Sequence, residues 1–226
     1  MLYQNRTHAG EVLAAELHQF ANRPNVLILA LPRGGVPVAF EIAKKLNLPL
    51  DVFIVRKLGV PGQEELAMGA IASGGARVIN DGVIEALKIP QSVIDEVAER
   101  EEVELERREI SYRSNRKPHA LEGMEVVLVD DGLATGASMK AAVRAVKMLN
   151  ARKIYVAVPV AERETSMNFQ SEVDQIFCAE TPSPFRGVGQ WYKDFSQTTD
   201  EEVTEYLSLV ENATPHAVPS TNQLNR

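Results

Sequence analysis

Two adjacent carboxylates, Asp130 and Asp131, follow the apolar run 126–129 and precede a loop of small residues. A short apolar run of this kind predicts a buried strand, and parallel sheets bind ligands at the carboxyl ends of their strands. The loop 132–138 contains glycines and hydroxyl side chains and opens a helical pattern, which predicts a site for an anion, most naturally a phosphate. Carboxylates repel phosphate, so the pair needs another partner, either sugar hydroxyls or Mg²⁺. The alternative is an ordinary strand–turn–helix in which the aspartates only cap the helix.

A second loop that could contact an anion, Pro32-Arg33-Gly34-Gly35, follows the apolar run 26–31. Its glycines permit unusual backbone dihedrals and a close approach to a ligand, and Arg33 supplies a fixed positive charge. An Arg-Gly-Gly sequence is also common as a simple tight turn. The motif by itself therefore leaves both interpretations open.

A basic pair, Arg56 and Lys57, ends the apolar run 52–55 on the side of the sheet where ligands are expected. The alternative is an ordinary surface pair. The segment that follows, residues 58–75, is rich in glycine and long for a connection in a compact domain, so it predicts a mobile lid.

Short apolar runs alternate with helical patterns along most of the chain. Uninterrupted apolar strands that alternate with helices predict a parallel sheet covered on both faces. We therefore expect an α/β fold, a parallel twisted sheet with helices on both faces. The predicted strands are residues 26–31, 52–55, 68–72, 126–129, 154–160 and 175–178, and the predicted helices are residues 36–46, 91–117 and 139–149.

The length of 226 residues suits one well-packed domain. We predict a single domain over residues 1–212, with its core at about 10–180, and a flexible tail over 213–226. Residues 91–117 are dense in Glu and Arg and predict an inserted helix with a charged outer face. This helix either serves contacts in a homodimer or shapes a binding pocket.

The strand, acidic pair and loop resemble the phosphoribosyl-pyrophosphate (PRPP) motif of the type I phosphoribosyltransferases, in the sequence VVLVDDGLATGAS of residues 126–138. The resemblance covers about residues 10–195 and implies the parallel-sheet fold of that family. It implies that Asp130 and Asp131 hold the ribose hydroxyls and form the place for the cofactor Mg²⁺. It also implies a 5′-phosphate site made by Gly132, Ala134, Thr135, Gly136, Ala137 and Ser138.

The same resemblance implies a Mg²⁺-dependent transfer of phosphoribose from PRPP to a nitrogenous base, with release of pyrophosphate. The Pro32 loop is similar to the family's pyrophosphate loop, which often contains a non-proline cis peptide. Positive charge would stabilise the departing pyrophosphate while the aspartates orient the sugar. The implied pyrophosphate-binding residues are Arg33, Gly34, Gly35, Arg56 and Lys57, and the implied catalytic residues are Arg33, Lys57, Asp130 and Asp131.

One departure from the family concerns Ala134, because the 6-oxopurine enzymes carry an acidic general base at this position. The amino-acid sequence of the loop is most similar to that of the adenine-type members. In those enzymes a glutamate of the lid approaches the base, so Glu64 and Glu65 are candidates for that role. A second interpretation is a non-catalytic regulatory protein of the same fold that senses PRPP or a nucleotide. The absence of an acidic general base from the loop favours a sensor, whereas the absence of a basic DNA-binding helix argues against a regulatory protein.

Residues 181–195, which we call the hood segment, contain the single tryptophan in a chain poor in aromatic residues. In the family a hood binds the base in this region, and stacking on an aromatic ring contributes about 1–3 kcal/mol per base. The resemblance implies base contacts from Phe185, Val188, Trp191 or Tyr192. The alternative is a hydrophobic plug that covers the sheet.

Composition excludes several classes of partner. The net charge of −7 repels nucleic acid and anionic lipid, no apolar run approaches the roughly 20 residues of a membrane span, and the first ten residues lack the apolar core of a signal peptide. These features predict a cytoplasmic protein with small-molecule partners. The single cysteine, Cys178, excludes a disulfide framework and a cysteine-cluster zinc site. The net charge does not exclude PRPP, because Arg33, Arg56 and Lys57 make the predicted cleft locally positive.

Overall fold

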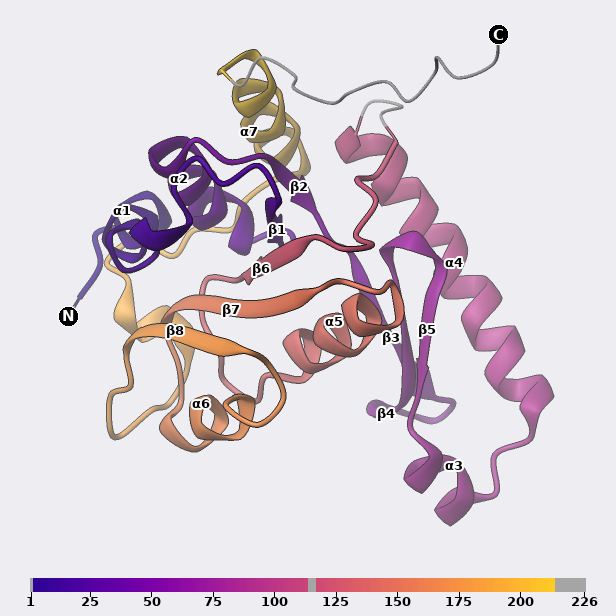
Figure 1. Ribbon diagram of the computed structural model, residues 1–226. Coiled ribbons are helices and arrows are strands. Elements are labelled where there is room, and N and C mark those ends of the chain that lie inside the picture. Colours follow the sequence, from indigo (N-terminus) through magenta and orange to yellow (C-terminus); the bar gives the residue numbers. More distant parts are fainter. Residues whose placement is uncertain (1, 114–116, 214–226) are drawn as a thin grey trace, which may run out of the picture.

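A five-stranded parallel sheet forms the centre of the molecule (Figure 1). The computed structural model describes residues 2–113 and 117–213. All five residues of the strand β1 (Val26–Ala30), the apolar run VLILA, are buried, as expected for a sheet covered on both faces. In spatial order the strands are β2 (Leu50–Val52), β1 (Val26–Ala30), β6 (Glu125–Val129), β7 (Lys153–Val160) and β8 (Gln175–Glu180).

Helices cover both faces of this sheet, which confirms the predicted α/β fold. Neighbouring residues of a strand point to opposite faces, so Ile28 and Val127 join one apolar cluster while Leu27 and Leu128 join the other. The first cluster includes side chains from α1 (Arg6–Glu16), α2 (Gly35–Leu46) and α7 (Asp200–Ala213), and the second includes side chains from α5 (Ala137–Met148) and α6 (Arg163–Phe169).

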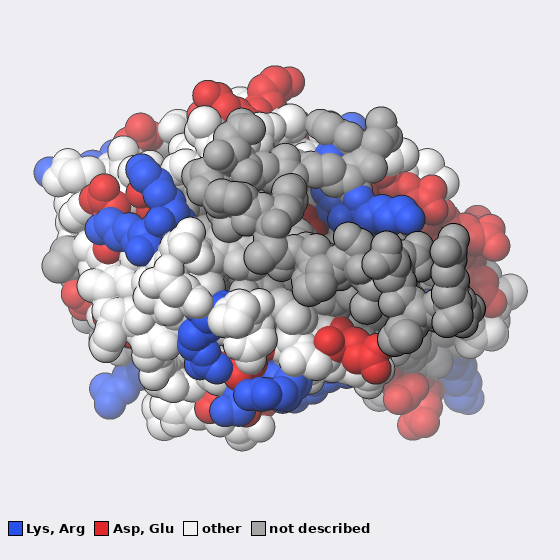
Figure 2. Space-filling view, turned by 45° about the horizontal axis from the view of Figure 1, so that its top comes forward, with Lys and Arg blue, Asp and Glu red and all other residues white. Residues whose placement is uncertain are grey.

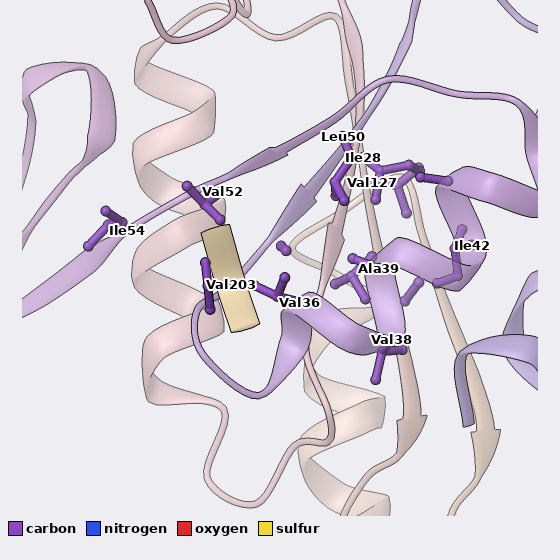
Figure 3. Packing of buried hydrophobic residues seen from close by; sticks show 14 of the residues in the cluster. Ile28, Val36, Val38, Ala39, Ile42, Leu50, Val52, Ile54, Val127 and Val203 are labelled. Atoms are coloured by element: carbon purple, nitrogen blue, oxygen red, sulfur yellow. The ribbon is translucent and has the colours of Figure 1, made fainter. Parts of the chain in front are cut away.

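The packing of α2 against the sheet fixes the loop that precedes this helix. Figure 3 shows Val36 and Ala39 of α2 near the sheet residues Ile28 and Val127, with Val203 of α7 beside Val36. Burying a Val or Ile side chain fully contributes roughly 1.5–3 kcal/mol. The start of α2, and with it the loop after β1, is therefore held on a rigid part of the core.

Residues 55–79 form a second, antiparallel sheet. Residues 68–72, predicted as a strand of the parallel sheet, belong to this second sheet, which corrects that prediction. The segment 58–75, predicted as a mobile lid, is mostly a regular hairpin, and its movement stays a prediction. The reason for the antiparallel pairing is the tight turn at Pro61 and Gly62, where Gly62 has a φ of 79°. A turn this short joins antiparallel strands, whereas parallel strands need a long crossover. The strands are β3 (Val55–Val60), β4 (Gln63–Ala72) and β5 (Ala76–Ile79), in that spatial order.

The charged segment is a long helix, α4 (Gln91–Arg113), which follows the short helix α3 (Asp81–Leu87). The prediction extended this helix to residue 117, but residues 114–116 lie outside the described part of the chain. The helix packs along one face against β3, β4 and α7, where Ile94, Val97 and Leu105 are buried. Most of its charged residues lie on the remaining, outer surface, whereas Arg113 at its end is buried.

The hood segment contains little regular structure. One short 3-10 helix, η3 (Val188–Trp191), lies in it, and a bridge between Tyr3 and Tyr192 connects it to the N-terminal part of the chain. The predicted flexible tail falls on residues outside the described part of the chain from 214 onward, and residue 213 is the last of α7, a helix that was not predicted. The other 3-10 helices are η1 (His18–Phe20) and η2 (Ser73–Gly75). Among the described residues, no helix is both long and apolar enough to cross a membrane.

Candidate functional site

The two predicted anion loops lie side by side at the carboxyl edge of the parallel sheet. Strands β1 and β6 are parallel neighbours with Ala30 opposite Val129, so the chain leaves both strands at the same edge. A side chain at Gly34 would overlap the Asp131 carboxylate, and a Cβ at Gly35 would lie 2.6 Å from the Val129 carbonyl oxygen. Glycine at these two positions is therefore what allows the first loop to contact the aspartate pair.

The first loop carries a cis peptide bond between Pro32 and Arg33, as the family resemblance implies. The Nη1 atom of Arg33 lies 3.6 Å from Oδ1 of Asp200, at the start of α7. The same oxygen accepts a hydrogen bond of 2.7 Å from the hydroxyl of Tyr112 in α4. Asp200 of α7, held in place by Tyr112 of α4, thus positions the Arg33 guanidinium.

The second loop offers a row of unused hydrogen-bond donors. Within the described part of the chain, the backbone N–H groups of residues 134–138 have no protein acceptor. Gly136 has a φ of 68°, a conformation that favours glycine, and it turns the chain into the first turn of α5. Together with Asp130 and Val188, the loop lines a cavity of about 190 Å³. Free N–H groups at a helix N-terminus are suited to binding a phosphate.

Contacts from neighbouring elements fix the second loop. The N–H of Leu133 donates to the Val160 carbonyl at 2.9 Å, and the hydroxyl of Thr165 in α6 donates to the Ala134 carbonyl at 2.7 Å. These contacts engage the Ala134 carbonyl and leave the N–H groups that follow it free. This polarity favours an anion over a cation in the cavity.

The two aspartates are partly buried, and their pKa values are raised. Burial raises the pKa of Asp130 well above its usual value, and the negative charge of Asp131 adds to the effect. Burial also raises the pKa of Asp131, although the Arg6 guanidinium opposes that shift. The pair therefore favours holding a proton until a cation or hydroxyl donors stabilise its charge.

Arg6, at the start of α1, is a site residue that the sequence analysis missed. Its Nε donates to Oδ2 of Asp131 at 2.8 Å, and its Nη1 donates to the Ser196 carbonyl at 2.6 Å. The guanidinium carbon lies 4.0 Å from the centre of the Phe195 ring. No local pattern could have identified Arg6, because Asp131 is 125 positions away in the sequence.

The predicted pyrophosphate-binding cations lie inside β3, not at the end of a parallel strand. Arg56 donates from Nε to Glu101 of α4 at 2.9 Å. Lys57 lies 3.2 Å from Glu65 and lines a cavity whose opposite side includes Ser138 of the second loop. Lys57 therefore lies on the same cavity as the second loop, whereas the Arg56 side chain is hydrogen-bonded to Glu101 of α4.

The glutamate candidates lie at the tip of the β3–β4 hairpin. Glu64 accepts a hydrogen bond of 3.1 Å from the N–H of Gly62, and Glu65 is the partner of Lys57. Neither residue lines the cavity at the second loop.

The hood residues differ in how close they come to the second loop. Of the four residues predicted to contact a base, Val188 alone lines the loop cavity, and a Cβ at Gly132 would lie 2.6 Å from its Cγ1. Phe185, Trp191 and the buried Tyr192 belong to one apolar cluster. The Tyr192 hydroxyl donates to the Asp131 carbonyl at 2.6 Å. These three aromatic side chains therefore pack with one another, as the plug interpretation expects, while Val188 also lines the loop cavity, so that the predicted base contacts stay a prediction.

The acidic pair is also the candidate place for a metal ion. Among the described residues, no group of three or more His, Cys, Asp or Glu is arranged to hold one. Mg²⁺, however, usually binds through one or two carboxylates together with water and substrate phosphates. Asp130 and Asp131 therefore fit Mg²⁺ as the partner of a bound phosphate compound rather than as a protein-only site.

Residues 61–190 match the model of the phosphoribosyl transferase domain family. The chain belongs to this family. The matched span contains the aspartate pair and the whole second loop, whereas the Pro32 loop of this phosphoribosyl transferase domain lies before it. The chain is also similar to TT1426 of Thermus thermophilus, whose crystal structure has a TM-score of 0.81 with this one. That match is 40% identical and covers 92% of this chain and 98% of the other.

Two Mycobacterium tuberculosis proteins, MT0597 and Rv0571c, bear names that assign them provisionally to the phosphoribosyl transferases. Each is 45% identical to this chain over 206 residues, which is 91% of the chain. The chain spans about half of their length, 46% in both cases. The phosphoribosyl transferase domain described here therefore corresponds to one part of those longer proteins.

Proposed function

We propose that the chain transfers phosphoribose from PRPP to a nitrogenous base and releases pyrophosphate. The observation that carries this proposal is the row of free N–H groups in residues 134–138 directly beside the carboxylates of Asp130 and Asp131. A phosphate suits the first group and hydroxyl donors suit the second, and a ribose 5-phosphate unit presents both within one small molecule. Membership in the phosphoribosyl transferase family supports the same substrate.

In this reaction the bond between C1′ and the pyrophosphate oxygen breaks, and a bond from C1′ to a ring nitrogen of the base forms. Residues 134–138 would hold the 5′-phosphate, and the two aspartates would accept hydrogen bonds from the ribose hydroxyls. The Pro32 loop, with Arg33, Gly34 and Gly35, and the cation Lys57 would face the leaving pyrophosphate. Because positive charge develops on the ribosyl group, catalysis would depend on positioning and on charge stabilisation.

Mg²⁺ is the proposed cofactor. When bound, it would neutralise charge on the pyrophosphate, with Asp130 and Asp131 as its protein ligands. The partial burial of both carboxylates supports this assignment, because buried charges require a partner.

The loop supplies no proton acceptor at Ala134. A base that must lose a proton on forming its bond to C1′ would therefore transfer that proton to a group outside this loop, such as Glu64, Glu65 or solvent, or would bind as an anion. The proposal accordingly favours acceptor bases whose reacting nitrogen is already deprotonated, or readily becomes so, at neutral pH.

A double substitution tests the proposal. Asp130→Asn with Asp131→Asn should abolish pyrophosphate release from PRPP and Mg²⁺ across a panel of purines, pyrimidines and orotate, because neutral amides bind both the metal and the ribose hydroxyls less strongly than carboxylates do. Asp81→Asn, which changes an exposed aspartate at the start of α3, should leave turnover unchanged. Unchanged turnover in a folded double variant would refute the assignment. PRPP binding by the unmodified protein without consumption by any base would instead favour the sensor.

A further inference from the structure

A groove of about 280 Å³ lies between α5 and the antiparallel sheet, beside the loop that we assign to the 5′-phosphate. One wall is the face of α5 that carries Lys140 and Arg144, and the other is the sheet, including Lys57. Ala137 and Ser138 line both this groove and the cavity at the second loop. The groove therefore adjoins the proposed donor site but has its own walls.

The charge of the groove differs from that of the chain. Of the described residues that line it, three are cations and none is a carboxylate, although the chain has a net charge of −7. On the face shown in Figure 2, by contrast, residues of both signs are interspersed among uncharged ones. A concave surface lined by charge of one sign attracts a ligand of the opposite sign.

The cations of the groove are largely available to a ligand. Arg144 makes no hydrogen bond or ion pair with another described residue, and Lys140 has a ring contact alone, 5.9 Å from the centre of the Phe169 ring. Lys57 pairs with Glu65, whose side chain is fully exposed, and such surface pairs contribute at most about 1 kcal/mol. An entering anion would therefore displace little.

The floor of the groove is largely apolar. Ala67, Gly69 and Ala70 of β4 line it without any bulky side chain, and Val55 and Val78 of the neighbouring strands line it beside them. A slot between a sheet surface of this kind and a helix accommodates a planar ring more readily than a branched aliphatic group. The combination of an apolar floor with cations on the wall matches an amphiphilic anion.

We propose that this groove binds a planar aromatic or heteroaromatic anion, with its ring on Ala67 and Gly69 and its phosphate or carboxylate at Lys140 and Arg144. Two sources share this chemistry, a nucleoside monophosphate and an aromatic carboxylate. The groove shares Lys57, Ala137 and Ser138 with the proposed transfer site, but Lys140 and Arg144, which would hold the anion, take no part in the proposed transfer reaction. Its occupant would bind together with a phosphoribosyl compound on the second loop.

Isothermal titration calorimetry with AMP, and separately with phthalate, tests this site while saturating ribose 5-phosphate occupies the second loop. We expect one of the two anions to bind to the unmodified protein and Arg144→Glu to weaken that binding at least tenfold. Lys147→Glu is the matched control, because it makes the same charge change at an exposed position of α5 outside the groove. It should change the dissociation constant less than twofold, and both variants should unfold at the same temperature.

The identity of the bound anion separates the two sources, and three results would overturn the site. The first is that neither anion binds, and the second is that both variants lose the same amount of affinity for the anion. The third is that pyrophosphate displaces the bound anion and binds as tightly as the anion does, which would assign the groove to the leaving group. If ribose 5-phosphate does not bind, the proposed function is contradicted. The same titrations without ribose 5-phosphate would still test the anion site in the groove, because they compare the anion affinity of the Arg144→Glu and Lys147→Glu variants.

Discussion

Arg6 and Asp131 form an ion pair that joins the first helix to the centre of the candidate site, with Nε 2.8 Å from Oδ2. The two side chains are only 11% and 14% exposed. A buried carboxylate without a partner would favour its neutral form, so Arg6 keeps Asp131 closer to the charged state in which it can accept hydrogen bonds from ribose. Arg6 is therefore a positioning residue for Asp131.

Arg6→Met should lower kcat/KM for PRPP-dependent turnover by about 10- to 100-fold, because a hydrogen bond to a charged group contributes roughly 1.5–3 kcal/mol. Without Arg6 the pKa of Asp131 rises further, so the acid limb of the pH–rate profile should move to higher pH. Arg6→Lys should restore part of the rate. Arg163→Met, at an exposed position of α6, is the control, and equal rates in the Arg6→Met and Arg163→Met variants would contradict this role.

Asp130→Asn should stabilise the fold at neutral and alkaline pH. The folded-state pKa of Asp130 is raised above the unfolded value of about 3.9, so its contribution to stability is fully present below that value and is lost as the pH rises through the folded pKa. The amide removes this loss, and a gain of 1 kcal/mol raises Tm by about 2–4 °C in a domain of this size. Thermal unfolding at pH 8 and pH 4 measures the effect. An equal rise in Tm at pH 8 and pH 4 would show that burial of the Asp130 charge does not cause the stabilisation.

Gly35→Ala should destabilise the protein by about 1–3 kcal/mol, because the added Cβ would lie 2.6 Å from the Val129 carbonyl oxygen and 2.9 Å from Cα of Asp130. Gly82→Ala is a matched control inside α3, where the added Cβ would lie 3.7 Å from Oδ1 of Asn80, an ordinary van der Waals contact. It should stabilise the helix by about 0.5–1 kcal/mol. Denaturant unfolding of both variants compares them directly, and a neutral Gly35→Ala would mean that the two loops are not in tight contact.

Asp51→Asn should destabilise the protein by about 3 kcal/mol at neutral pH, since Asp51 lies 2.9 Å from the buried Arg113 and accepts a hydrogen bond from the backbone of His119. Burial alone would raise the pKa of Asp51, but the hydrogen bonds from His119 and the charge of Arg113 outweigh burial and lower it. Stability from this group is therefore present above about pH 3.9 and is lost as the pH falls through the folded pKa.

The difference in unfolding free energy between this variant and the unmodified protein should accordingly narrow between pH 5 and pH 2. Urea unfolding across that range checks it. A difference that stays constant with pH would mean that the carboxylate charge does not stabilise the fold.

Local patterns were sufficient for the parts of the site that follow strands. The apolar runs of β1 and β6 predicted where the loops with Gly34 and Asp131 begin, because an uninterrupted apolar run has few alternatives to a buried strand. The hairpin of β3 and β4 escaped prediction because its exposed tip dilutes the apolar pattern and its turn lies inside the segment assigned to a lid.

Contacts between distant segments could not be predicted from the sequence. Arg6 stands in a polar stretch without a motif, and Asp200, the partner of Arg33, lies in a helix that was not anticipated. The hydroxyl of Tyr192, one of the candidates for a base contact, donates to the backbone carbonyl of Asp131, a contact that the sequence did not indicate. Each of these contacts depends on the tertiary fold, which local periodicity does not determine.

The contacts of Asp131 with Arg6 and Tyr192 also bear on the order of folding. One partner comes from the first helix and the other from the segment after the last strand of the sheet, at separations of 125 and 61 positions. Contacts between remote segments form late, because the loop between them must close first. The strand before Asp131 can pair with β7 across the short connection through α5, but the Asp131 carboxylate gains its native surroundings only when both ends of the domain have docked. The titration of Asp131 would then report completion of the whole fold, and a partly folded chain would retain the ordinary acidity of an exposed aspartate.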